Sequence, residues 1–108
     1  MVELTKREEF LLLAILELKE NAYIVSLRRH IKEISGRSIN HGSLCNTLSA
    51  LIRKGYIKSK ESLPLPQKGG RRKVMYFLTH EGKQALTKAY EIQKLAWDGF
   101  VHMMAQFD

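Results

Sequence analysis

Small polar side chains gather between residues 40 and 53, on one side of a segment whose spacing predicts a helix. Asn46 stands near the middle of this polar side, and an asparagine amide pairs well with adenine in the major groove of DNA. Small neighbours let backbone and groove come close together, which suits the reading of bases. The candidates for DNA contact on this segment are Asn40, His41, Ser43, Asn46, Thr47 and Arg53. The alternative is a polar face that meets only solvent.

A second group of cations follows in a loop that contains two adjacent glycines. These cations are Lys68, Arg71, Arg72 and Lys73. Because glycine permits close approach, they would hold backbone phosphates or enter a minor groove, and so fix the position of the protein more than read sequence. The alternative is a charged loop tip surrounded by water. Weaker candidates for phosphate contact are Arg28, Arg29 and Lys32.

The net charge of the chain is concentrated in the same region. The 108 residues include 18 Lys or Arg and 11 Asp or Glu, which gives a formal net charge of +7. Residues 1–25 carry −2 and residues 74–108 carry −1, whereas residues 26–73 carry +10. A basic segment between mildly acidic ends is typical of a surface that meets phosphate, although a lysine-rich face kept for solubility would have the same charge.

Catalytic and metal-binding chemistry has little support in the residue pattern. No Ser-His-Asp set, phosphate-binding glycine pattern or pair of carboxylates in an apolar setting is apparent, so we do not expect an enzyme. The histidines lie far apart, without acidic or cysteine partners at ligand spacing, so we expect no metal and no cofactor. They are His30, His41, His80 and His102. Cys45 is either a redox-responsive thiol beside a helix start or, as is commoner, a small buried filler.

Length and hydropathy indicate one small cytoplasmic domain. A chain of 108 residues with 44% hydrophobic residues suits a single globular unit. Its longest apolar run covers only residues 10–16, whereas a bilayer span needs roughly 20 residues. The N-terminus lacks the pattern of a signal peptide, and a single cysteine cannot form an internal disulfide. We therefore expect no contact with the membrane.

The candidate site depends on several predicted elements. Thr5 and Glu8 have the spacing of a capping box at the start of a first helix. Residues 10–18 of this helix are apolar nearly all round, so one face would meet the core and the other a second subunit. A second helix is predicted over residues 24–34, with Gly36 just after its end.

The third predicted helix begins at Asn40, a favoured N-cap, and ends at Lys54, which a glycine follows. Its apolar stripe consists of Leu44, Leu48, Leu51 and Ile52. Residues 56–60 and 73–78 are predicted strands of a hairpin, since the second is rich in β-forming residues and both prolines lie between them. In the second strand the residues that share one face are Val74, Tyr76 and Leu78.

Thr79 is predicted to cap a last helix that reaches Phe107. Its apolar stripe consists of Leu86, Tyr90, Trp97, Val101 and Met104. So much apolar surface on a terminal helix is best covered by a second copy, together with Phe10 and Leu13 of the first helix. Gly99 is expected to weaken this helix by about 1 kcal/mol and to allow a bend.

The predicted order of elements is helix, helix, helix, strand, long loop, strand, helix. This order is that of the winged-helix variant of the helix-turn-helix module. The expected fold class is therefore mainly α with a small β-hairpin. We expect a winged-helix DNA-binding domain over residues 1–79 and a C-terminal dimerisation helix over residues 80–108.

Seven short motifs occur in this chain in a fixed order. They are FLLLAILEL at residues 10–18, NAY at 21–23, GSL at 42–44, LSAL at 48–51, KGYI at 54–57, GGRRK at 69–73 and LTHEG at 78–82, with Tyr76 and Leu86 at the matching places. The set resembles the PadR-like family of bacterial transcriptional regulators over residues 8–90. This chain departs from the family in having Cys45 where an aromatic residue is usual and Ile24 where a glycine is usual.

The resemblance implies a homodimeric regulator, more often a repressor than an activator, that binds double-stranded DNA. Some relatives hold planar compounds between aromatic residues of the last helix. Trp97 is therefore a candidate contact for a small planar aromatic effector, or else only a part of the dimer interface. The alternatives to a DNA-binding regulator are a winged-helix protein-interaction module and an RNA-binding winged helix.

Overall fold

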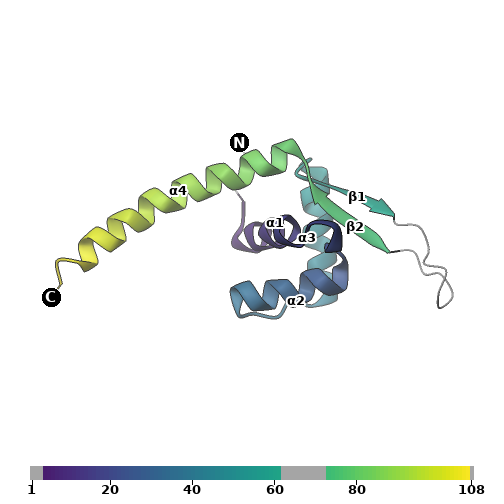
Figure 1. Cartoon of the computed structure of the whole chain (residues 1–108), viewed down its shortest axis with the longest axis horizontal. Coiled ribbons are helices and arrows are strands. Elements are labelled where there is room, and N and C mark those ends of the chain that lie inside the picture. The colour runs from purple at the N-terminus through teal and green to yellow at the C-terminus, as the bar shows by residue number, and fades with distance from the viewer. Residues whose placement is uncertain (1–3, 62–72, 108) are drawn as a thin grey trace.

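The computed structural model describes residues 4–61 and 73–107. In this part of the chain the elements are, in order, α1 (Lys6–Leu18), the 3-10 helix η1 (Lys19–Asn21), α2 (Ile24–Ser35), α3 (His41–Arg53), β1 (Ile57–Glu61), β2 (Val74–Leu78) and α4 (His80–Met104). Helices α1 to α3 pack together beside the hairpin, and α4 projects away from them (Figure 1). The structure has the mainly α fold with a small hairpin that the sequence predicts.

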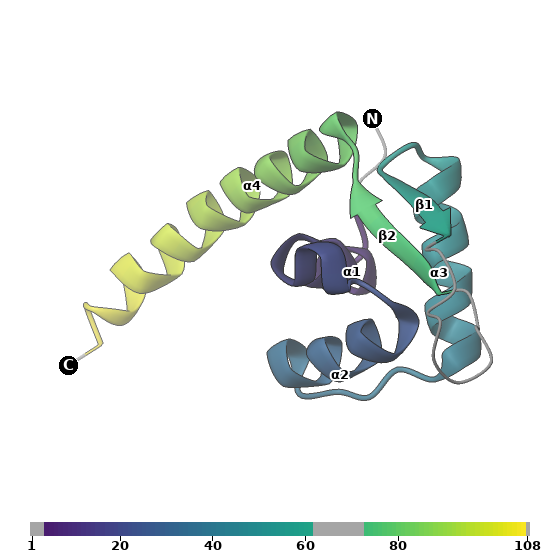
Figure 2. The same ribbon diagram turned by 45° about the vertical axis from the view of Figure 1, so that its right-hand side comes forward.

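Helix α1 lies at the centre of the molecule, between α2, α3 and the hairpin (Figure 2). The core around it consists of Leu11, Leu12, Ala14, Ile15, Ala22, Leu27, Ile31, Ile39, Leu44, Leu48, Leu51, Ile57 and Tyr76. Each fully buried leucine or isoleucine stabilises the fold by about 1.5–3 kcal/mol relative to an exposed one. Ile52, which belongs to the predicted apolar stripe, lies outside this core, because it is about 100° round α3 from Leu51 and is 42% exposed.

The helix starts follow the predicted capping chemistry. The Thr5 hydroxyl accepts a hydrogen bond from the Glu8 amide at 3.1 Å, and the Glu8 carboxylate accepts one from the Thr5 amide at 2.9 Å. The Asn40 side chain accepts a hydrogen bond from the Ser43 amide at 2.8 Å. These bonds satisfy backbone groups that a helix start leaves free, so the first and third helices begin where the sequence predicts.

The hairpin is antiparallel, with Ile57 opposite Leu78 and Glu61 opposite Val74. Each strand begins one residue later than predicted. The Tyr76 amide donates a hydrogen bond to the Ala22 carbonyl at 3.0 Å, so the hairpin is fixed to the end of η1. The face shared by alternate residues of β2 packs on the core, as the alternation predicts.

Helix α4 begins after Thr79, whose hydroxyl accepts a hydrogen bond from the Gly82 amide at 3.1 Å. It ends at Met104, three residues before the predicted end, and runs unbroken through Gly99. Gly99 therefore does not end the helix. At about 1.5 Å per residue α4 is roughly 37 Å long, a large part of a molecule that measures 62 × 29 × 22 Å. None of the described helices is long and apolar enough to cross a bilayer.

Candidate nucleic-acid interface

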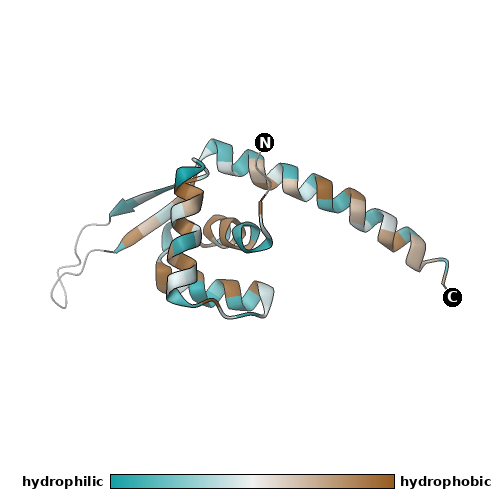
Figure 3. Ribbon diagram, turned by 180° about the vertical axis from the view of Figure 1, so that it is seen from behind, coloured by the Kyte–Doolittle hydropathy of each residue, from teal (hydrophilic) through white to brown (hydrophobic). Residues whose placement is uncertain are grey.

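Helix α3 presents a polar face to solvent between two flanking structures. In Figure 3 it lies at the front of the molecule, with the hairpin on one side and α1 and α2 on the other. Of the predicted contacts, this face brings together Asn40, His41, Asn46 and Arg53, all exposed. Ser49, which the site prediction left out, is exposed as well, one turn after Cys45. An exposed helix of this kind fits the major groove of DNA, which admits one α-helix.

Thr47 is placed differently from the prediction. It is only 9% exposed, and its hydroxyl donates a hydrogen bond to the Ser43 carbonyl at 2.8 Å. The reason is its position in the helix, three residues after Leu44 and four before Leu51, both of which face the core. Ser43 is half-buried at the same edge of α3. The polar face is thus narrower than the sequence suggests.

The start of α3 holds two side chains that interact with each other. The Cys45 sulfur lies 3.4 Å from the His41 Nε2 atom, one turn earlier. Cys45 is half-buried, so it is neither a core filler nor an open thiol.

Burial raises the pKa of the Tyr76 phenol, and Cys45 adds to this effect. Asn40 caps the helix with its side-chain oxygen.

The hairpin supplies cations beside α3. Lys73 is exposed, and its ammonium lies 5.2 Å from the centroid of the Tyr23 ring. The other three predicted loop cations, Lys68, Arg71 and Arg72, lie outside the described residues. The site prediction missed Lys58 and Lys60 on β1, which are exposed at alternate positions of one strand. The two lysines are two residues apart in a predicted strand, and this spacing would have placed both on one face of the strand.

Two other basic residues have structural partners. The Arg28 guanidinium donates a hydrogen bond to the Ile39 carbonyl at 3.2 Å, so it holds the turn between α2 and α3. The Lys54 ammonium lies 2.6 Å from the carboxylate of Glu8, which is only 5% exposed. Burial alone would raise the pKa of Glu8, but the bonds from Lys54 and Thr5 outweigh it and hold that pKa below its ordinary value.

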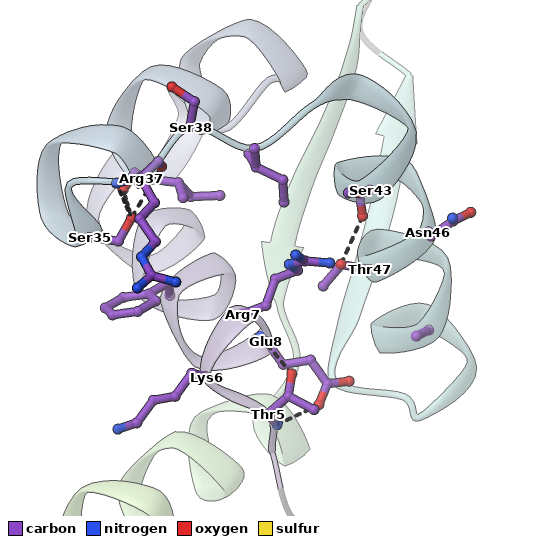
Figure 4. A pocket seen from close by; sticks show the side chains of 14 residues that line it. Thr5, Lys6, Arg7, Glu8, Ser35, Arg37, Ser38, Ser43, Asn46 and Thr47 are labelled. Carbon is purple, nitrogen blue, oxygen red and sulfur yellow. Dashed lines mark hydrogen bonds between the residues drawn. The ribbon is translucent and has the colours of Figure 1, made fainter.

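A pocket of about 610 Å³ opens between the start of α1, the end of α2 and the edge of α3 (Figure 4). Asn46 and Ser43 line it from α3, and Arg7 of α1 and Arg37 after α2 bring two positive charges, with the Arg7 side chain pointing toward Thr47 (Figure 4). Its remaining lining is largely apolar or hydroxyl-bearing, with Phe10 among it. Among the described residues, no group of three His, Cys, Asp or Glu could hold a metal ion.

Comparison with known proteins shows what kind of protein carries this surface. A family model described as the transcriptional regulator PadR-like family matches residues 12–88, well over half of the chain. The chain belongs to the PadR-like family. No curated protein matches the sequence significantly.

Solved structures agree with this assignment. A PadR family transcription regulator from hypervirulent Clostridium difficile R20291 is 32% identical; the match covers 93% of this chain and 96% of that one, with a TM-score of 0.62. A PadR-like transcription factor from Bacteroides fragilis is 22% identical over 90% and 92% of the two chains, with a TM-score of 0.67. F93 from STIV, described as a winged-helix DNA-binding protein, is 22% identical over 85% and 92%, with a TM-score of 0.61.

These matches confirm the predicted family and the winged-helix fold. The protein is a DNA-binding transcription regulator of the PadR-like family, and members of this family are not enzymes. In the vocabulary of this fold, α3 is the recognition helix and the hairpin is the wing.

The last helix of this PadR-like chain leaves a broad apolar surface in contact with solvent. Its exposed large apolar side chains are Tyr90, Ile92, Leu95, Trp97, Phe100, Val101, Met103 and Met104. The Trp97 and Phe100 rings meet edge to face, with centroids 5.1 Å apart. Two residues predicted for a dimer interface are partly engaged inside the chain, since Leu86 packs on the core and Phe10 lines the pocket. Leu13 is 38% exposed.

Proposed function

We propose that the protein is a sequence-specific transcriptional repressor that binds double-stranded DNA as a homodimer. The observation that carries the proposal is the exposed polar face of α3 with the wing cations beside it. A helix that enters the major groove reads base edges, whereas cations beside it hold the phosphate backbone.

Each group of residues has its own part in this proposal. Asn46 reads a base, and its neighbours Asn40, His41, Ser43 and Arg53 lie close enough in the helix to contact bases or phosphates. Thr47 only supports the helix, because its hydroxyl is already bonded within α3. The cations of the hairpin and its loop hold phosphates. They are Lys58, Lys60, Lys68, Arg71, Arg72 and Lys73.

The exposed apolar side of α4 supports the homodimer. Val101 is 63% exposed and Trp97 is 58% exposed, and burying such side chains against a second copy gains roughly 25 cal/mol per Å² of apolar surface. In this arrangement residues 1–79 form the DNA-binding domain and residues 80–108 the dimerisation helix. A symmetric dimer requires a binding site with two symmetric halves.

A small planar aromatic compound is a candidate effector, and Trp97 would be its contact. The supporting observation is that Trp97 is 58% exposed although its ring already meets Phe100. Titration of the dimer with planar aromatic compounds should quench the fluorescence of Trp97, which is the only tryptophan of the chain. If no such compound quenches it, the effector proposal fails and Trp97 belongs to the interface alone.

The function is tested by selection of binding sites from random duplex DNA. We expect an enriched sequence with two inverted half-sites, and we expect a reporter gene placed behind that sequence to be repressed by the protein. Failure to enrich any duplex above the random pool would overturn the proposal. Tighter binding to single-stranded RNA than to the duplex would instead favour an RNA-binding winged helix, and activation of the reporter would overturn the repressor role.

A further inference from the structure

A pocket lies beside the recognition helix, between α1, the end of α2 and α3 (Figure 4). Helices α1 and α2 lie on the side of α3 opposite to the wing (Figure 3). Asn46 and Ser43 belong both to its lining and to the proposed DNA-contacting set. A duplex seated on α3 would therefore pass directly over the mouth of the pocket. This position makes the cationic side chains of the pocket candidates for contact with the same DNA.

Two of those side chains are unpaired cations. Arg7 comes from the first turn of α1, and Arg37 comes from the turn between α2 and α3. Within the part of the chain that the structure describes, neither guanidinium makes an ion pair or a hydrogen bond. Two exposed guanidinium groups without an acidic partner have their full charge available for an external anion.

The acidic side chain among the described lining residues does not cancel this charge. Glu8 is buried, and its carboxylate is held by Lys54 at 2.6 Å and by the Thr5 amide at 2.9 Å. A third cation at the rim, Lys6, donates a hydrogen bond to Gln93 at 2.7 Å and is less available. Among the described residues, the pocket therefore presents Arg7 and Arg37 as cations without an acidic partner, beside Asn46 and Ser43.

The shape of the major groove would bring the phosphate backbone of DNA close to Arg7 and Arg37. The major groove is about 12 Å wide, so a helix seated in it has a phosphate backbone on each side. The wing cations Lys58, Lys60 and Lys73 flank α3 on one side and so meet one strand. The pocket flanks it on the other side and so meets the second strand.

We propose that Arg7 and Arg37 bind backbone phosphates of the DNA strand opposite to the strand held by the wing. The inference rests on the proposed function, because it needs α3 in the groove. Each guanidinium presents a planar set of donors that matches phosphate oxygens in pairs. Contacts of this kind set the position of the recognition helix and carry no base preference.

The test measures duplex affinity as a function of salt concentration. Each phosphate contact contributes about −0.9 to the slope of log affinity against log salt. The double variant Arg7→Ala, Arg37→Ala should therefore lower the steepness of that slope by roughly 1.8, on the selected site and on random duplex alike. The matched control removes two exposed cations of α4, Lys83→Ala and Lys88→Ala, and should leave the slope unchanged.

A second pair of variants separates lost contacts from lost structure. Arg7→Lys and Arg37→Lys keep the charge and should restore most of the slope, and thermal unfolding of every variant should match that of the wild type. A double alanine variant that keeps its fold and its wild-type slope would overturn the inference. The proposed function fails separately, if the wild-type protein itself does not bind duplex DNA.

A further experiment determines which DNA strand each group of cations contacts. Single phosphates along one half-site are replaced, one at a time, by neutral methylphosphonates. A phosphate bound by Arg37 should weaken wild-type binding when it is neutralised but should have no effect on the Arg37→Ala variant. Phosphates that couple in this way to Arg7 and Arg37 should lie on the strand opposite to those that couple to Lys58 and Lys60. Coupling of both groups to one strand would overturn the assignment.

Discussion

Asn46 is the side chain on which sequence preference depends most. It is exposed on α3, and an asparagine amide both donates to and accepts from the edge of adenine. Asn46→Ala should weaken binding to the best site by roughly 1–3 kcal/mol and leave binding to random duplex nearly unchanged. The measurement is the Kd on both DNAs. The matched control is Ser49→Ala, and an equal loss on random duplex would show that Asn46 only contacts the backbone.

Glu8 is a buried acid whose ionisation stabilises the fold. Because its pKa in the folded chain lies below the ordinary value of 4.5, its contribution is fully present above that pH and is lost as the pH falls through the folded pKa. Glu8→Gln keeps a capping side chain but leaves the half-buried Lys54 without its partner. We expect a loss of about 2 kcal/mol at neutral pH.

Denaturant unfolding of the wild type and the Glu8→Gln variant from neutral to acidic pH checks this prediction. The difference in unfolding free energy should shrink toward acidic pH, since Glu8 itself becomes neutral there. A difference that stays constant over the whole range would show that the Lys54 ion pair contributes nothing to stability.

The junction between the hairpin and α4 depends on close packing of two elements. A Cβ atom at Gly82 would lie 2.1 Å from the Tyr56 carbonyl oxygen, which already accepts a hydrogen bond from the Thr79 amide. Gly82→Ala should therefore destabilise the fold by roughly 1–3 kcal/mol, because backbone has to move.

Gly99, in the same helix, is the matched control. A Cβ atom there would meet nothing within 4 Å, so Gly99→Ala should stabilise α4 by up to about 1 kcal/mol. Thermal unfolding of both variants measures the contrast. Equal effects of the two substitutions would contradict the close approach at Tyr56.

Local chemistry explains which elements were predictable from the sequence. Caps such as Thr5 and Asn40 act over three residues, so the helix starts follow from neighbouring residues alone. The prediction places Thr47 on the polar face because of its residue type, although its spacing from Leu44 and Leu51 puts it on the buried side of α3. Arg7 and Arg37 line one pocket because three helices pack together there. The two residues are thirty positions apart in the sequence, so no local pattern predicts that they lie near each other.

At the scale of the whole molecule, the apolar side of α4 requires a partner. Val101→Glu would place a charge in the proposed interface and should convert the dimer to a monomer or an aggregate that binds DNA weakly. Deletion of residues 87–108 should have the same effect. Light scattering after size-exclusion chromatography measures the mass, with Lys88→Glu as the control on the polar side. A monodisperse monomer with full DNA affinity would refute the dimer.

The attachment of α4 to the rest of the chain has a mechanical consequence. Its middle is tied to α1 through Gln93, which accepts a hydrogen bond from Lys6 and donates one to Glu9, and the residues beyond it are exposed. A tilt of about 10° at Gln93 would displace the far end of α4, roughly 16 Å beyond it, by roughly 3 Å. Since the two recognition helices of a dimer must meet half-sites one helical turn apart, about 34 Å, small angular changes at Gln93 would decide which half-site spacing is accepted.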